Sequence, residues 1–270
     1  MALRLEPLDK ELEERYSKLV YSDPVKYLFF IIDWKYLSDL SKIFLAMDGD
    51  NIEGLMVIYK ESTIQLRGKK DAMAFLFEHV DKDEIELMAP LVMEETALRT
   101  YEPAKKGEVY AMVMVKDDLK VQMTEEPEEL TVADVKDIQE LLTISNPASW
   151  VTWTEEGLAK TFEDYKWYGI KVDGELTAVG QSRIYDFTGV VHVISTHPDH
   201  RGKGYAKSIV STIVSRIFEA TDMAIIYVFV DNTPALKAYS SVGFRPHSKN
   251  ILMGKAKRKK VRIDLDGHLV

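Results

Sequence analysis

The spacing of hydrophobic residues divides the chain into two halves, of which the second has the clearer pattern. Some of its segments carry apolar residues at three- and four-residue intervals, as in amphipathic helices, and others are short β-branched runs, as in strands. Between two such runs, Asp173-Gly174 is typical of a tight hairpin turn. The expected elements are helices at 132–142 and 155–165, strands at 167–172, 176–184 and 190–194, a helix at 203–220, a strand at 224–230, a helix from Asn232 or Thr233 to Gly243, and strands at 244–247 and 251–256. This order predicts an α/β sandwich with a mixed sheet.

The first half repeats the same plan in shortened form. Its expected elements are strands at 44–47, 52–59 and 63–66, followed by an apolar helix that ends near Val80. Where the third strand meets this helix, Arg67-Gly68-Lys69-Lys70-Asp71-Ala72 lines up with Arg201-Gly202-Lys203-Gly204-Tyr205-Ala206 of the second half. The last strand of the first half is expected at 109–115, and that of the second at 251–256. An internal duplication therefore predicts a degenerate domain at 1–125 and a complete one at 126–270, joined by the acidic stretch 125–129.

Composition indicates a packed protein without disulfides. Of the 270 residues, 46% are hydrophobic and 29% are charged, which is typical of a globular core with a polar surface. The longest apolar run, at 27–32, is far shorter than the ~20 residues of a membrane-spanning helix. We recognise no secretory leader, and with no cysteine there is no disulfide or cysteine zinc site. We therefore expect a cytoplasmic protein without membrane contact, whose two-domain layout is compatible with a monomer.

Charge disfavours a nucleic-acid partner. The formal net charge is −9, whereas nucleic-acid-binding domains usually carry a basic field. The exception is the run Lys257-Arg258-Lys259-Lys260. It has two interpretations, a phosphate contact or a solvated strand edge protected by lysines, and the second is the more common.

The segment Arg201 to Ala206 is the strongest candidate for chemistry. It follows a strand and opens an amphipathic helix, so several backbone N–H groups lie unpaired at the positive end of that helix. Gly202 and Gly204 let the backbone approach a ligand, and Arg201 and Lys203 add positive charge. The spacing matches neither the Walker motif nor the dinucleotide fingerprint. On these residues alone the loop binds a nucleotide phosphate or simply caps the helix.

Two motifs together resemble the GNAT superfamily of N-acetyltransferases. Its loop consists of Gln or Arg, two residues, Gly, one residue, then Gly or Ala, and Arg201, Gly204 and Ala206 match it. The lead-in Thr196-His197-Pro198 is similar to the end of the family's strand. Downstream, the run from Asp231 to Gly243-Phe244 is similar to the second signature, in which an asparagine is followed by a tyrosine and then Gly-Phe. The resemblance covers about residues 130 to 256.

The resemblance implies an acetyl-CoA site and no metal. The cofactor would lie in a V-shaped opening between the third strand and the strand at 224–230, with its pantetheine arm along the first of these. The implied cofactor-binding residues are Ile194, Ser195, Thr196, Arg201, Gly202, Lys203, Gly204, Tyr205, Ala206 and Asn232. Tyr239 matches the tyrosine that protonates the departing thiolate in many members. A packing role is the alternative, because Tyr239 shares a helix face with apolar residues.

The general base departs from the family pattern. Many relatives carry a glutamate on the third strand, but 188–196 contains no acidic residue. His192 is the candidate there, since a neutral imidazole can accept a proton from an amine. The alternatives are a hydrogen-bonded core histidine, the weaker candidate Asp186, and an amine that arrives already deprotonated.

The resemblance implies transfer of an acetyl group to a primary amine of a small molecule, amino acid or peptide. The acceptor would attack the acetyl-CoA directly in a ternary complex. The alternative is a CoA-binding regulatory module without turnover. In the first half, Lys70 stands where the loop needs its second glycine. We therefore expect that half to bind no CoA and to form one wall of the substrate cleft. This layout is similar to that of the tandem, glycine N-acyltransferase-like members.

Overall fold

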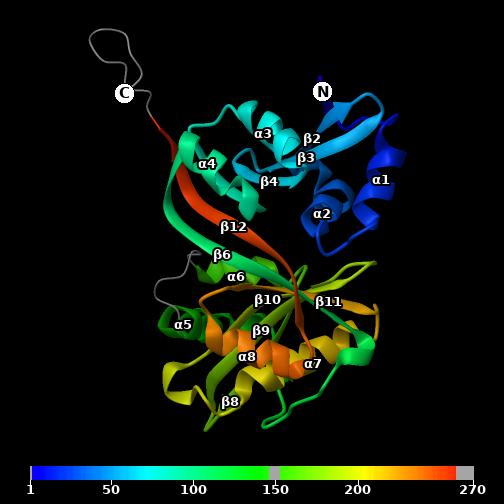
Figure 1. Cartoon of the computed structure of the whole chain (residues 1–270). Helices are drawn as coiled ribbons and strands as arrows, with labels where there is room; N and C mark the ends of the chain where they lie inside the picture. The colour runs from blue at the N-terminus through cyan, green and yellow to red at the C-terminus, as the bar shows by residue number, and fades with distance from the viewer. Residues whose placement is uncertain (1, 146–152, 260–270) are drawn as a thin grey trace, which may run out of the picture. The chain divides into compact units, whose positions relative to one another are not determined.

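The computed structural model describes residues 2–145 and 153–259 (Figure 1). Lys260, the last residue of the basic run, lies outside these residues. The chain folds into two compact units. Unit 1 combines 1–109 with 248–270, and unit 2 is 110–247. No helix in the described ranges is both long and apolar enough to cross a membrane.

Unit 1 places helices against a mixed sheet. Its strands follow the order β1-β2-β3-β4-β5-β12, with β4 and β5 parallel. Its elements are β1 (Arg4–Pro7), α1 (Glu13–Tyr21), α2 (Leu28–Tyr36), β2 (Ser41–Asp48), β3 (Asn51–Tyr59), β4 (Thr63–Gly68), α3 (Lys70–Glu78), β5 (Glu84–Pro90), α4 (Glu94–Thr100), the start of β6 (Tyr101–Val115) and most of β12 (Arg245–Arg258).

Unit 2 repeats this plan around a second mixed sheet. Its strands follow the order β6-β11-β10-β9-β8-β7, in which β10 and β11 are parallel. Its elements are the end of β6, β7 (Glu128–Glu129), α5 (Val135–Ser145), α6 (Glu155–Thr161), β8 (Lys166–Val172), β9 (Glu175–Ile184), β10 (Gly189–Thr196), α7 (Tyr205–Ile217), β11 (Met223–Phe229) and α8 (Thr233–Val242). The α5–α6 pair and the α7–α8 pair pack into separate hydrophobic clusters. The predicted α/β fold with a repeated layout is confirmed.

Local sequence explains where the elements of unit 2 begin and end. Thr131 and Asp134 form a reciprocal capping box before α5. Asp173 and Gly174 both have positive φ, as the two-residue hairpin between β8 and β9 requires. The Asn232 side chain accepts a hydrogen bond from the N–H of Ala235 and so caps α8.

The two units exchange the strands that close them, which the sequence patterns did not predict. β12 pairs with β5, and its Ile251 and Met253 lie in the core of unit 1. In return, Met112 and Met114 of β6 lie in the core of unit 2, against α7 and β11. The expectation that each half closes on its own last strand is therefore wrong. The predicted boundary near residue 125 was placed from the sequence repeat, whereas the boundaries of the compact units are set by the packing of the folded chain.

Candidate functional site

The strands β10 and β11 run together only over their first residues. They pair in parallel from Gly189↔Ala224 to Val191↔Ile226, and β10 then continues beside β9 alone. A register shift between Val191 and Ile194 marks the point of separation. Such an irregularity bends a strand away from its neighbour. One edge of β10 is therefore open beyond Val191.

The open edge presents main-chain groups of alternate residues. The N–H of His197 donates to the carbonyl of Thr177 (2.8 Å), and Ser195 lies opposite Val179 in the same register. In an antiparallel ladder every second residue bonds to the partner strand, so Ser195 faces β9. The N–H and carbonyl groups of Ile194 and Thr196 consequently point to the open side.

The glycine loop follows β10 and leads into α7. Gly202 and Gly204 have φ of 78° and 91°, a left-handed conformation that suits glycine. Gly204 is the N-cap of α7, so the first backbone N–H groups of the helix, including those of Tyr205 and Ala206, have no acceptor inside it. A Cβ added to Gly202 would meet nothing within 4 Å. The loop thus offers N–H donors and a positive helix end beside free space.

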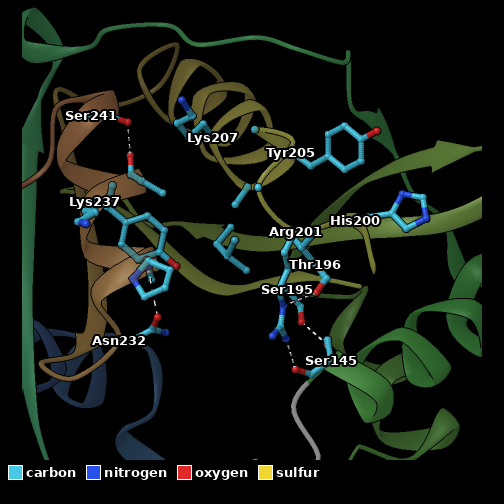
Figure 2. Close-up of a pocket in the computed structure, with 18 residues that line it drawn as sticks. Ser145, Ser195, Thr196, His200, Arg201, Tyr205, Lys207, Asn232, Lys237 and Ser241 are labelled. Atoms are coloured by element: carbon cyan, nitrogen blue, oxygen red, sulfur yellow. Dashed lines mark hydrogen bonds between the residues drawn. The ribbon is translucent and has the colours of Figure 1, made fainter. Parts of the chain in front are cut away.

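A pocket of about 760 Å³ joins this loop to β10 and α8 (Figure 2). Most of the predicted site residues line it, namely Ile194, Ser195, Thr196, Arg201, Gly202, Gly204, Tyr205, Ala206, Asn232 and Tyr239. Lys203 and His192 are not among its lining residues. The lining residues that were not predicted are Ser145, His200, Lys207, Pro234, Ala235, Lys237, Ala238 and Ser241. No aspartate or glutamate occurs among the described residues that line it.

Arg201 bonds to protein carbonyls in this structure. Its Nη2 donates to the carbonyl of Ser145 at the end of α5 (2.7 Å), and its Nε donates to that of Thr196 (3.4 Å). The hydroxyls of Ser145 and Ser195 are hydrogen-bonded to each other beside it (Figure 2). These bonds tie the loop to α5 and β10. They give Arg201 a positioning role, and the charge that it would supply to a diphosphate stays a prediction.

Tyr239 reaches the pocket from α8. Its side chain is buried, and its ring lies edge-on to Phe244 at 6.4 Å between centroids. Burial raises the pKa of the Tyr239 phenol above its usual value near 10. The phenol therefore carries its proton at neutral pH, although the same shift makes it a weaker acid. Its packing in the core also fits the alternative interpretation.

His192 lies on β10 at the point where the strands separate. Its ring lies edge-on to Tyr165, with 5.0 Å between centroids. Desolvation, and then the positive charge of Arg183, lower the pKa of His192 below its usual value near 6.5. Its side chain keeps exposed surface, so water screens part of this effect. His192 is therefore neutral at pH 7 and has one ring nitrogen able to accept a proton.

The corresponding loop of unit 1 is closed. The N–H of Lys69 donates to the carbonyl of Glu53 (2.9 Å), and a Cβ on Gly68 would lie 2.4 Å from that same oxygen. The buried Arg67 donates to the carbonyls of Lys26 and Leu66. The loop therefore lies directly on β3, and its backbone leaves no approach for a ligand of the kind that Gly202 allows.

The α/β fold of unit 2 is similar to that of solved GNAT proteins. Residues 135–244 match the model of the acetyltransferase (GNAT) family. A mycothiol acetyltransferase from Streptomyces griseus is 23% identical over 173 residues, which cover 62% of this chain. The match covers 49% of that relative, so the chain spans about half its length.

Solved structures share the fold over nearly the whole chain. A Drosophila protein aligns with 96% of this chain and 99% of its own length, at a TM-score of 0.70 and 13% identity. A tandem GNAT protein from the clavulanic acid biosynthesis pathway aligns with 95% of this chain and 98% of its own, at a TM-score of 0.57 and 11% identity. At these identities the likeness concerns the fold.

Proposed function

We propose that the protein is an N-acetyltransferase that uses acetyl-CoA as co-substrate and a primary amine of a small molecule, amino acid or peptide as acceptor. The observation that carries the proposal is one pocket shared by three features: the open edge of β10, the glycine loop and Tyr239. The match of residues 135–244 to the acetyltransferase (GNAT) family supports it.

The pocket fits the two ends of a CoA molecule. The N–H groups of the loop, from Gly202 to Ala206, suit its diphosphate, because a helix N-terminus with free donors favours anions. The main-chain N–H and carbonyl of Ile194 and the N–H of Thr196 suit the amides of an extended pantetheine arm, which would add to β10 as another strand does. When bound, acetyl-CoA supplies the activated thioester. Asn232 lines the pocket, but its side-chain oxygen already caps α8. We therefore expect Asn232 to lie near the ligand without binding it through that oxygen.

Two residues would carry out the two proton transfers of the reaction, one as donor and one as acceptor. An acceptor amine must lose a proton on attack, and the leaving thiolate must gain one. Tyr239, protonated and buried at the pocket wall, serves as the donor to sulfur. His192, neutral at the strand separation, serves as the acceptor of the amine proton. Both amine and thioester are held in place by the fixed edge of β10, and this positioning lowers the entropic part of the barrier.

Thiol release tests the proposal. The full chain is mixed with acetyl-CoA and a panel of primary amines, and free CoA thiol is measured together with direct CoA binding. We expect binding and amine-dependent thiol release. A chain that binds no CoA would contradict the proposal.

One observation favours the second candidate, a CoA-binding regulatory module. The stretch 188–196, which includes β10, carries no carboxylate that could act as a base. Saturable CoA binding without turnover of any amine in the panel would favour this module.

Replacement of His192 by Gln tests its part in catalysis. We expect kcat/KM for the amine to fall about 100-fold, the usual contribution of a general base. In the native protein the acid limb of the kcat/KM profile should lie below pH 6.5, because the lowered pKa keeps the ring neutral to lower pH; the variant should lack this limb. An unchanged rate and pH profile would mean that the amine arrives deprotonated.

A further inference from the structure

One wall of the pocket carries two lysines beyond the glycine loop. Lys207 lies on α7, one residue after the last amide of the loop, and Lys237 lies on α8 (Figure 2). Lys237 and Ser241 are four residues apart, on one face of α8, and both line the pocket. The two helices therefore each contribute one lysine to the lining of the same pocket.

Five lysines in the described part of unit 2 have no salt bridge, and of these only Lys207 and Lys237 line the pocket; the other three are Lys116, Lys120 and Lys203. The paired ones are Lys136 with Glu140, Lys160 with Glu156, Lys166 with Glu129, and Lys171 with Glu128 and Asp134. Within the described part of the chain, Lys207 and Lys237 form no salt bridge, and the pocket lining there contains no acid. In a chain with a net charge of −9, two uncompensated cations at one pocket wall indicate an anionic ligand group.

The glycine loop alone would bind only one of the anionic groups of such a ligand. Its N–H groups and helix end suit one diphosphate, and Arg201 already bonds to the carbonyls of Ser145 and Thr196. Lys207 and Lys237 are separate from those amides and come from two different helices. A phosphomonoester carries nearly two negative charges at pH 7, so it matches two ammonium groups better than one.

We propose that Lys207 and Lys237 form a subsite for a phosphomonoester, which in CoA is the 3′-phosphate of the adenosine. This inference rests on the proposed function, because it takes CoA as the ligand of the pocket. It makes the two lysines the residues that select CoA over 3′-dephospho-CoA. Both ligands keep the diphosphate and the pantetheine arm, so the difference between them reports this subsite alone.

Isothermal titration calorimetry on the full chain tests the subsite. CoA and 3′-dephospho-CoA are titrated into the native protein and into the double variant Lys207→Met, Lys237→Met. We expect the native protein to bind CoA roughly 10- to 100-fold more tightly than 3′-dephospho-CoA, as charge-assisted phosphate contacts imply. The double variant should bind both ligands alike, with the affinity that the native protein has for 3′-dephospho-CoA.

A matched control removes two charges elsewhere in unit 2. Lys136→Met with Lys160→Met alters the net charge equally, but both residues are exposed on α5 and α6 and do not line the pocket. This control should keep the native preference for CoA. Equal native affinities for the two ligands, or a preference that survives in the Lys207 and Lys237 variant, would overturn the subsite while leaving CoA binding intact. Failure of the native protein to bind either ligand would overturn the proposed function and the subsite together.

Discussion

The variant Gly202→Glu is expected to bind CoA at least about 100-fold more weakly than the native protein. Gly202 lines the pocket, and the place of its Cβ is open, so a glutamate side chain would enter the space that the diphosphate needs. Two like charges about 4 Å apart repel by about 4 kcal/mol at an effective dielectric constant near 20, and about 2.7 kcal/mol already corresponds to 100-fold. Calorimetric titration with CoA measures the loss.

Gly174→Glu is the matched control for this variant. Gly174 has a φ of 86°, close to the 78° of Gly202, and its Cβ place is equally open. Both variants therefore carry a similar backbone strain, about 1–2 kcal/mol for a non-glycine residue at positive φ. Gly174 lies in the hairpin between β8 and β9, away from the pocket, so its variant should bind CoA normally. Gly204 is a poorer test, because its Cβ would lie 2.8 Å from Thr124. If Gly202→Glu and Gly174→Glu bound CoA with equal affinity, the glycine loop would not be part of the CoA site.

The variant Tyr239→Phe is expected to lower kcat about 100-fold with little change in the Kd for CoA. The substitution removes only the hydroxyl, and the buried ring keeps its packing against Phe244. Proton donation in the transition state typically contributes 10²–10⁴-fold in rate, so the loss should appear in turnover rather than in binding. Steady-state thiol release and calorimetric CoA titration separate the two quantities.

Tyr205→Phe is the control at the same pocket. Tyr205 is also buried and lines the pocket, but its contribution to the loop is a main-chain N–H that the substitution keeps. We expect kcat close to that of the native protein. If Tyr239→Phe retained the native rate, the residue would have only its packing role.

The helices and strands of unit 2 were predictable because each carries its own local signal. The stripe of apolar residues in α7, the Asp173-Gly174 turn and the Asn232 cap all act within a few residues. In unit 1, β5 was missed although Glu84, Ile85, Glu86 and Leu87 alternate between exposed and buried positions. That period of two was a usable signal for a strand.

The strand exchange and part of the pocket could not be predicted from the sequence. The segments 109–115 and 251–256 are both apolar strands, and nothing local decides which sheet each one joins. The pocket brings together Ser145, Lys207 and Lys237 from three helices, so their proximity depends on the fold. Arg201, predicted to supply charge, bonds to carbonyls that only the folded chain places beside it.

Hydrogen exchange of the full chain with and without CoA tests the central claim most directly, because it locates the site. The account predicts that saturation with CoA slows exchange of the amides in 194–206 and leaves those in 67–72 unchanged, with one CoA bound per chain. The open loop at Gly202 and the closed one at Gly68 are the reason for this asymmetry. Protection at 67–72, or no protection at 194–206 under saturating CoA, would contradict the account.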